Sequence, residues 1–379
     1  MAILPQRNAF NKRHSHWLAV ASEVFAPALR LTARLAVPAP VSPPTTWRRM
    51  LIVGDTHIGD VLYRTPSLAP LKLGLPNCEI HYLASGMEAE LLHGNSAITN
   101  VLPWRTTDYL LDLSAEQQEK LRAMKFDAML CTNAVRGWPE LLLALRLGIP
   151  NRVAYGHRGL SGWITFPIQA IHPQSFPGYF RDMVAGLTGR PPDWELRPVV
   201  NVSAEDTTEA ETFWQELGYH SDERVVACFV TSRQLGVVFP PEWFGRALHL
   251  LQAQTGCRLV LCGAKTDQQE LETLRQNFRL RAELNAGHLK LRALIPFLKR
   301  CCVTFCQDSG ARHLSNAAGI PVVFVRNLRV NAVETGVYCH TEIDLIPPRI
   351  ERVPPSHQNE VIAQITPESA VTVLKRILA

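Results

Sequence analysis

Short apolar segments that alternate with longer segments of helical spacing constrain the fold more than any other feature of this sequence. The first apolar run, at 50–53, precedes a predicted helix at 61–74, and further strands are predicted at 79–84, 128–132 and 152–155. Such runs are typical of strands that are buried on both faces of a parallel sheet. The alternation therefore predicts an α/β domain with helices on both faces of its sheet.

A second series of the same kind follows. It predicts strands and helices over 225–230, 241–255, 258–262, 267–277, 291–299, 302–306, 311–318 and 320–325. Because 379 residues exceed one ordinary domain, we expect two Rossmann-like, doubly wound parallel-sheet domains that face a ligand cleft. The expected divisions are an N-terminal extension over 1–49, a first domain over 50–188, a linker over 189–199, a second domain over 200–350 and a C-terminal segment over 351–379 that carries a terminal helix.

The net charge of +5 belongs to the N-terminal extension. Residues 1–50 hold seven Lys and Arg residues and one acid, whereas the rest of the chain holds 32 basic and 33 acidic side chains. Because the body is nearly neutral, no extended nucleic-acid-binding surface is expected. A stiff proline linker ends the extension, with Pro38, Pro40, Pro43 and Pro44.

The segment 17–37 is the most apolar part of the extension. Glu23, Arg30 and Arg34 interrupt it, and the sequence has no uncharged apolar run long enough for a transmembrane helix. Two interpretations stay open: residues 1–37 contact an anionic membrane peripherally, or they pack on the body or form a disordered tail. Without a secretory cleavage signal, we expect a cytoplasmic protein, either free or peripheral on the inner face of the plasma membrane.

Nine cysteines are scattered along the chain, several of them within apolar runs, as at Cys228 and Cys262. The odd number and the size of the chain argue against a disulfide framework and predict buried free thiols in a reducing compartment. The cluster of Cys301, Cys302 and Cys306 lacks the ligand spacing of a zinc site. No metal is expected.

The loop after the first predicted strand, residues 54–60, contains a first candidate site. Its glycines have the spacing of a phosphate-binding P-loop, but Asp60 stands where such a loop has lysine. A carboxylate at the carboxyl end of a strand and beside a helix N-terminus stays ionised, and it can accept a proton from a substrate hydroxyl. The alternative is that Asp60 caps a helix that begins at Val61.

A second candidate site follows the predicted strand at 302–306. Here the chain turns through Asp308, Ser309 and Gly310 into a predicted helix that carries His313. The free N–H groups of a first helical turn bind anions, and a glycine lets a diphosphate approach closely. The alternative is that Asp308 or Ser309 caps the helix and that His313 is only packed.

A third candidate site follows the first strand of the second series. Thr231, Ser232 and Arg233 provide two hydroxyls and a guanidinium after a strand, a combination that suits phosphate. The alternative is an ordinary polar loop.

Taken together, these segments resemble glycosyltransferase family 9, the ADP-heptose:lipopolysaccharide heptosyltransferases. The resemblance rests on the strand and loop that end in Ile58-Gly59-Asp60, on the segment 285–291 and on the motif from Asp308 to His313. It extends over residues 50–345, with these motifs in the family's order.

The resemblance implies a GT-B fold, in which two Rossmann-like domains face a cleft and a C-terminal helix crosses back to the first domain. The first domain would bind the acceptor, with Asp60 as the general base in an acceptor loop that includes Thr56, His57 and Gly59. The second domain would bind the donor, a nucleotide sugar. Its implied donor-binding residues are Thr231, Ser232, Leu289, Asp308, Ser309, Gly310 and His313.

One position departs from the family pattern. Several members have a lysine shortly after the Thr/Ser pair, and this chain has Val237 there. Arg233 is our candidate for the missing positive charge.

The resemblance implies an inverting glycosyltransferase that needs no metal or other cofactor. It would move a sugar, heptose from ADP-heptose above all, to a hydroxyl of the lipopolysaccharide core or a related surface glycan. Two alternatives stay open. One is a sugar-nucleotide epimerase or hydrolase of the same fold, and the other is a catalytically degenerate glycan- or nucleotide-binding member.

Overall fold

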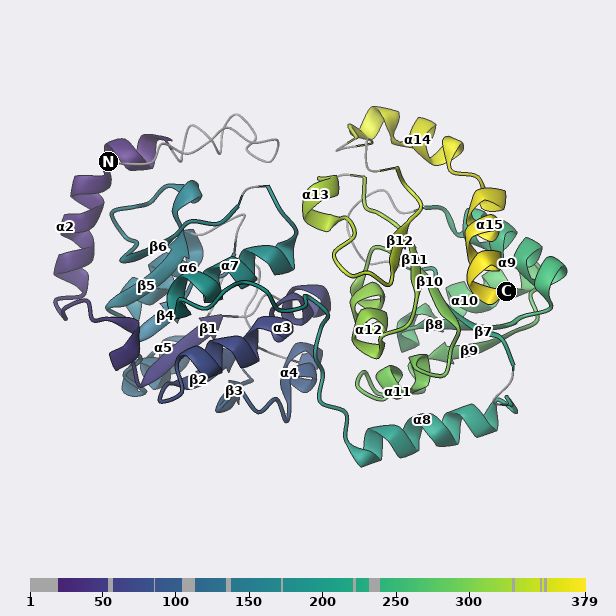
Figure 1. The fold of residues 1–379 in the computed structure, drawn as a ribbon, viewed down its shortest axis with the longest axis horizontal. Helices are drawn as coiled ribbons and strands as arrows, with labels where there is room; N and C mark the ends of the chain where they lie inside the picture. The colour runs from purple at the N-terminus through teal and green to yellow at the C-terminus, as the bar shows by residue number, and fades with distance from the viewer. Residues whose placement is uncertain are drawn as a thin grey trace. The chain divides into compact units, whose positions relative to one another are not determined.

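The computed structural model describes residues 20–53, 57–84, 86–103, 113–133, 138–171, 173–220, 223–231, 239–328, 331–347, 350 and 353–379. The chain divides into two compact units, Met1–Leu196 and Arg197–Ala379 (Figure 1). Each unit contains a six-stranded sheet with all of its strands parallel. Within the described residues, no helix combines the length and the apolar character that crossing a membrane requires.

The sheet of the first unit has the strand order β3-β2-β1-β4-β5-β6. Its strands are β1 (Arg49–Val53), β2 (Glu79–Leu83), β3 (Asn100–Leu102), β4 (Ala128–Leu130), β5 (Asn151–Tyr155) and β6 (Phe166–Ile168). The helices are α2 (Ala26–Ala36), α3 (Ile58–Gly74), α4 (Gly86–Leu92), α5 (Ala115–Ala123), α6 (Trp138–Arg146) and α7 (Phe176–Thr188), with 3₁₀ turns at Pro44–Thr46 and Gly156–Arg158.

The residues of β1 explain why this sheet is covered on both faces. Met50 and Ile52 belong to one apolar cluster, whereas Leu51 and Val53 belong to another. Successive side chains of a strand point to opposite faces, so a continuous apolar run requires a hydrophobic layer on each side. The predicted strands at 50–53, 79–84, 128–132 and 152–155 are confirmed within two residues at either end.

The sheet of the second unit has the order β12-β11-β10-β7-β8-β9. Its strands are β7 (Val225–Phe229), β8 (Arg258–Gly263), β9 (Ala282–Ala286), β10 (Val303–Gln307), β11 (Val322–Val325) and β12 (Glu342–Asp344). The helices are α8 (Ala204–Glu216), α9 (Pro241–Thr255), α10 (Gln268–Asn277), α11 (Leu294–Leu298), α12 (Gly310–Ala318), α13 (Ala332–Thr335), α14 (Gln358–Gln364) and α15 (Pro367–Leu378), with 3₁₀ turns at Lys265–Asp267 and Pro355–His357.

The C-terminal segment differs from the expectation in one respect. The single terminal helix expected there is two helices, because Thr366 caps a new helix whose first residue is Pro367. The resemblance also implied a helix that crosses back to the first domain. Within the second unit, α15 buries Val371 and Leu374 in the core and packs on α9; the crossing back to the first domain stays a prediction.

Candidate active site

The first candidate site lies at the beginning of α3, just after the carboxyl end of β1. The helix begins at Ile58, three residues earlier than expected, and His57 is its N-cap residue. Asp60 therefore lies inside the first turn and does not cap the helix, so the capping interpretation is wrong. Its side chain is 34% exposed, and its Oδ2 atom lies 3.4 Å from Nδ1 of the exposed His57. A carboxylate in this position is stabilised in its charged form by the helix dipole.

Two buried charged residues near Asp60 were not predicted. Arg64, one turn further along α3, donates from Nη1 to the backbone carbonyl oxygen of Asp60 at 3.0 Å. Glu88 of α4 is also buried, and burial raises its pKa. The charge of Asp60 raises that pKa further, whereas His57 lowers it. The only sequence signal for either residue is the four-residue spacing from Asp60 to Arg64.

Two more residues of the expected acceptor loop are Gly59 and Thr56. Gly59 is the second residue of α3, beside Asp60. Thr56 lies outside the described residues.

The second candidate site lies where β10 ends and α12 begins. Ser309 is the N-cap residue of α12, with an extended backbone and no capping hydrogen bond from its side chain. Asp308 does not cap the helix either. Its Oδ1 accepts from Nη1 of Arg312 at 3.0 Å, and its Oδ2 accepts from the backbone N–H of Asn327 at 3.4 Å. The capping alternative is therefore wrong for both residues, and Gly310 opens the helix.

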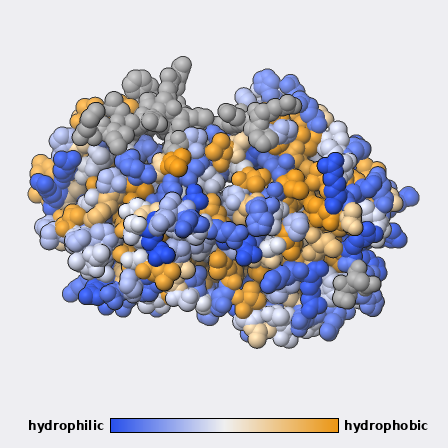
Figure 2. All heavy atoms as spheres, in the orientation of Figure 1, coloured by the Kyte–Doolittle hydropathy of each residue, from blue (hydrophilic) through white to orange (hydrophobic). Residues whose placement is uncertain are grey.

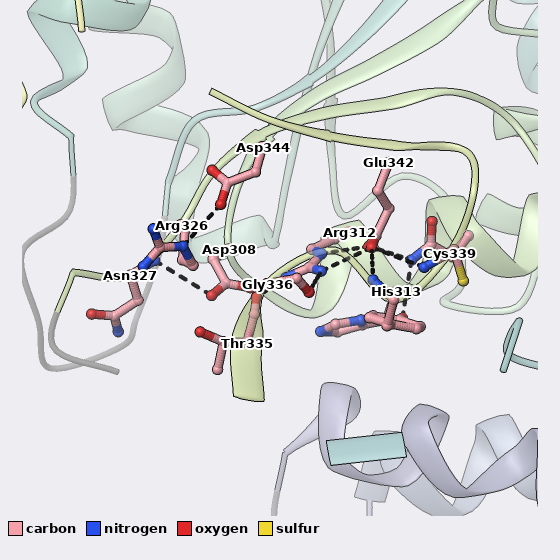
Figure 3. Close-up of polar contacts among 12 residues, drawn as sticks. Asp308, Arg312, His313, Arg326, Asn327, Thr335, Gly336, Cys339, Glu342 and Asp344 are labelled. Carbon is pink, nitrogen blue, oxygen red and sulfur yellow. Dashed lines mark hydrogen bonds and ion pairs between the residues drawn. The ribbon is translucent and has the colours of Figure 1, made fainter. Parts of the chain in front are cut away.

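Arg312 is the centre of the polar network in Figure 3. Its side chain is fully buried, and it donates to both carboxylate oxygens of Glu342, at 2.5 and 2.9 Å. It also donates to the carbonyl oxygens of Thr335 and Gly336, and its guanidinium lies 3.8 Å from the ring centroid of Phe324. Burial lowers the pKa of Arg312, but Glu342 and Asp308 outweigh that effect and raise the pKa. The sequence analysis did not identify this residue.

His313 is a buried histidine. Burial lowers the pKa of His313 well below its usual value, and the charge of Arg312 lowers it further. Its Nδ1 lies 2.6 Å from the hydroxyl oxygen of Tyr338, and the two rings stack 5.5 Å apart. The same hydroxyl oxygen accepts from Nδ2 of Asn316 at 3.0 Å. If the hydroxyl proton of Tyr338 is donated to Nδ1, the imidazole carries its own proton on Nε2.

The third candidate site shares a sheet edge with the second. Thr231 follows β7, which is hydrogen-bonded to β10, so both loops leave the sheet at the carboxyl ends of neighbouring strands. Oγ1 of Thr231 donates to Oδ2 of Asp267 at 3.2 Å. Gln307 connects the two loops, because its Nε2 donates to the carbonyl oxygen of Val230 at 2.6 Å. Ser232, Arg233 and Val237 lie outside the described residues.

Leu289 lies in the loop that follows β9 of the same sheet. It follows β9, the strand beside β8, and it is buried. Its backbone N–H donates to Oδ1 of Asn285 at 3.4 Å. Across the part of the chain that the structure describes, no three His, Cys, Asp or Glu side chains form a group that could hold a metal ion.

Comparison with known proteins identifies the family. The model of glycosyltransferase family 9 (heptosyltransferase) matches residues 118–325, more than half of the chain. The chain belongs to glycosyltransferase family 9. Membership makes it a glycosyltransferase, and the two parallel-sheet α/β units are those of the GT-B fold. A search of curated proteins found no match.

Solved structures of the family share this fold. A family 9 glycosyltransferase from Veillonella parvula aligns with a TM-score of 0.73 and 16% identity, over 87% of this chain and 97% of the other. The ADP-heptose lipopolysaccharide heptosyltransferase II of E. coli aligns with a TM-score of 0.65 and 16% identity, over 87% of this chain and 98% of the other. The E. coli heptosyltransferase WaaC, solved with ADP, aligns with a TM-score of 0.64 and 17% identity, over 87% of this chain and 99% of the other.

Proposed function

We propose that this family 9 enzyme transfers a sugar, heptose from ADP-heptose above all, to a hydroxyl of a lipopolysaccharide-core or related surface glycan. Asp60 is the general base of the proposed reaction. The observation that carries this role is the position of Asp60: a partly exposed carboxylate in the first turn of α3, next to the carboxyl end of a central strand. Ligands of open α/β sheets bind at this edge.

The proposed reaction inverts the anomeric carbon in a single displacement. The acceptor hydroxyl loses its proton to Asp60 as its oxygen forms a bond to the anomeric carbon. On the opposite side of that carbon, the bond to the diphosphate oxygen breaks, and ADP leaves with the electron pair. Thr56, His57 and Gly59 are proposed to surround the acceptor hydroxyl.

The donor side of the proposal rests on the loops at the carboxyl edge of the second sheet. Ser309 and Gly310 begin α12 with backbone N–H groups that can bind a diphosphate oxygen. With its proton on Nε2, His313 is proposed to donate a hydrogen bond to the same anion. Thr231, Ser232 and Arg233 are assigned to the phosphates, Asp308 to the sugar side and Leu289 to the adenine.

Stabilisation of the leaving group by helix N–H groups and cationic side chains is proposed here in place of a metal ion. Arg233 takes the role of the lysine that Val237 replaces. The choice of ADP as the nucleotide is supported by WaaC, which has been solved with ADP and with ADP-2-deoxy-2-fluoro heptose.

We propose that the enzyme is located in the cytoplasm and acts at the inner face of the plasma membrane. A lipid-linked acceptor is embedded in that surface, and a cytoplasmic nucleotide sugar reaches it from the same side.

The test separates chemistry from binding with paired variants. We expect Asp60→Asn to lower transfer by at least about 100-fold, since positioned general bases contribute this much or more. Its ADP affinity, measured by calorimetry, should stay unchanged. His313→Ala should instead weaken ADP binding. The control is Asp193→Asn, which changes an exposed carboxylate of the same unit and should leave both quantities unchanged.

Near-normal transfer by Asp60→Asn would contradict the base assignment. Nucleotide release at the full rate without any acceptor would indicate an epimerase or hydrolase instead. A thermal-shift screen of ADP-, GDP- and UDP-sugars identifies the donor, because a ligand at about 100 times its dissociation constant adds roughly 2.7 kcal/mol to stability.

A further inference from the structure

Helix α2 is attached to the first unit by its small residues. Ala26, Ala33 and Val37 are buried, and the latter two form a cluster with Leu145 of α6. The contact is close, because a Cβ atom added at Gly162 would lie 2.7 Å from Cβ of Leu29 and nearer still to the carbonyl oxygen of Ala26. This side of the helix therefore fits the body at van der Waals distance.

Hydrogen bonds attach the same side of the helical segment. The backbone N–H of Ser161 donates to Oε1 of Glu23 at 3.0 Å, and the Ser161 hydroxyl donates to Oε2 at 2.6 Å. The Trp163 indole donates to the hydroxyl of Thr32 at 3.3 Å. Glu23 is the one acidic residue among the first 50, so the acidic group of this segment is directed at the body.

The opposite side of the segment carries its large apolar residues, and they are exposed. Val24, Leu31 and Leu35 are 71%, 60% and 75% exposed, and Phe25 is 63% exposed. With the exposed Ala28, Leu31 and Leu35 form a stripe along α2 at the spacing i, i+3 and i+7. Helical geometry places Ala28, Leu31 and Leu35 about half a turn away from Ala26 and Ala33 of the same helix.

Two exposed arginines lie along this stripe. Arg30 and Arg34 directly precede Leu31 and Leu35 and flank the stripe on one side. At the edge of the molecule where α2 lies in Figure 1, Figure 2 shows hydrophobic and hydrophilic atoms side by side. An ordinary surface helix buries its large apolar residues, whereas α2 exposes Leu31 and Leu35 beside its arginines and buries only Ala26 and Ala33.

We propose that the outer face of α2, namely Ala28, Leu31 and Leu35 with Arg30 and Arg34, docks on an anionic lipid bilayer together with Val24 and Phe25, which directly precede the helix. The leucines and Phe25 enter the boundary between headgroups and acyl chains, and the arginines bind lipid phosphates. The biological purpose of this contact rests on the proposed function, because it brings the enzyme to a lipid-linked acceptor. The contact itself does not depend on the donor or on Asp60.

Charge and size favour a lipid surface over a second copy of the chain. The segment 1–50 carries a net charge of +6, from seven basic residues and one acid, and this charge attracts anionic lipids. A second copy would bring like charges together. The stripe lies on a helix of 11 residues that is roughly 16 Å long. A stable protein interface buries about 800 Å² on each partner, and one face of so short a helix is small for that.

The test is co-sedimentation of the full chain with vesicles. We expect binding to vesicles of phosphatidylethanolamine and phosphatidylglycerol, weaker binding at high salt, and little binding to pure phosphatidylcholine. Leu31→Ser/Leu35→Ser should reduce partitioning by roughly 10-fold or more. Arg30→Gln/Arg34→Gln should reduce it by about fivefold per charge. Thermal unfolding should be unchanged in both variants, because all four side chains are exposed.

A matched control is Leu73→Ser/Ile171→Ser, which removes two exposed apolar residues of the same unit that lie outside α2. It should bind vesicles like the wild type. Equal binding by Leu31→Ser/Leu35→Ser and the wild type would overturn the proposal, and so would equal binding to phosphatidylcholine. A dimer that dissociates in the leucine variant, without vesicle binding, would assign the face to a second copy.

The vesicles contain neither donor nor acceptor, so this result is independent of catalysis. Failure of the ADP assays would leave vesicle binding intact, and failure of vesicle binding would leave transfer to a water-soluble acceptor intact.

Discussion

Arg312 connects three segments of the second unit through one side chain. It binds the carboxylate of Asp308, the carbonyl oxygens at 335 and 336, and Glu342 at the beginning of β12. The adjacent His313 is in turn held by Tyr338, which follows the same carbonyl groups in sequence. A buried guanidinium therefore determines the position of the loop that the proposed donor contacts.

We predict that Arg312→Met lowers the free energy of unfolding by about 3–5 kcal/mol, because it leaves two buried carboxylates without their cation. Urea unfolding measures the change. Lys120→Met is the control, since the pair of Lys120 with Glu116 is exposed and its loss should leave the urea midpoint unchanged. Combining Arg312→Met with Glu342→Gln should recover part of the loss. Equal effects of the Arg312 and Lys120 substitutions would contradict this account.

At the scale of elements, the four strands that the sequence analysis missed are the outermost strands of the two sheets: β3, β6, β9 and β12. Three of them have only three residues, and β6 contains Pro167. An outer strand pairs on one side only, so it tolerates proline and requires no continuous apolar run. Helices α5 and α8 were missed despite capping boxes that begin at Ser114 and Ser203, which a search for that motif would have found.

The attachment of α2 gives a prediction at this scale. Gly162→Ala places a methyl group against the backbone of α2 at Ala26, so the helix must move away from the body. Trypsin should then cleave at Arg30 and Arg34 faster than in the wild type, as followed by mass spectrometry. Gly186→Ala is the control, because its methyl group meets only the flexible end of Ile168, at 3.2 Å. Unchanged cleavage in Gly162→Ala would show that α2 is not held in this way.

At the scale of the whole molecule, the cysteines are part of the two cores. All nine are free, and all are buried except Cys302, which is partly buried. Burial raises the pKa of Cys78 to about 12, to which Asp127 contributes, and it raises the pKa of Cys262 to about 12. The thiolate is the reactive form. These thiols therefore react slowly with thiol reagents, because they are inaccessible and because they stay protonated.

We therefore predict that dithionitrobenzoate at mildly alkaline pH modifies no more than one thiol rapidly in the folded protein and nine in guanidinium chloride. Cys302→Ser should abolish the rapid phase, whereas Cys339→Ser should leave it unchanged, because Cys339 is buried. Absorbance of the released thiolate measures both phases. Rapid modification of several thiols in the folded state would contradict the buried positions.

The amino-acid sequence by itself determined the inner strands of both sheets and the loops that follow them. Strands that are buried on both faces of a parallel sheet are continuous apolar runs, and the alternation of such runs with helical segments is visible without coordinates. The positions of Asp60 and of the segment from Asp308 to His313 followed, because each directly succeeds such a run.

Only the tertiary structure decided which side chains meet. Arg312 looks like a surface residue in the sequence, and its partners at Thr335 and Glu342 lie 23 and 30 positions away. The large apolar residues of α2 are its strongest local feature, yet the folded chain uses the small residues Ala26 and Ala33 for contact with the body. Burial and long-range hydrogen bonds depend on where distant segments pack, and local periodicity carries no record of that.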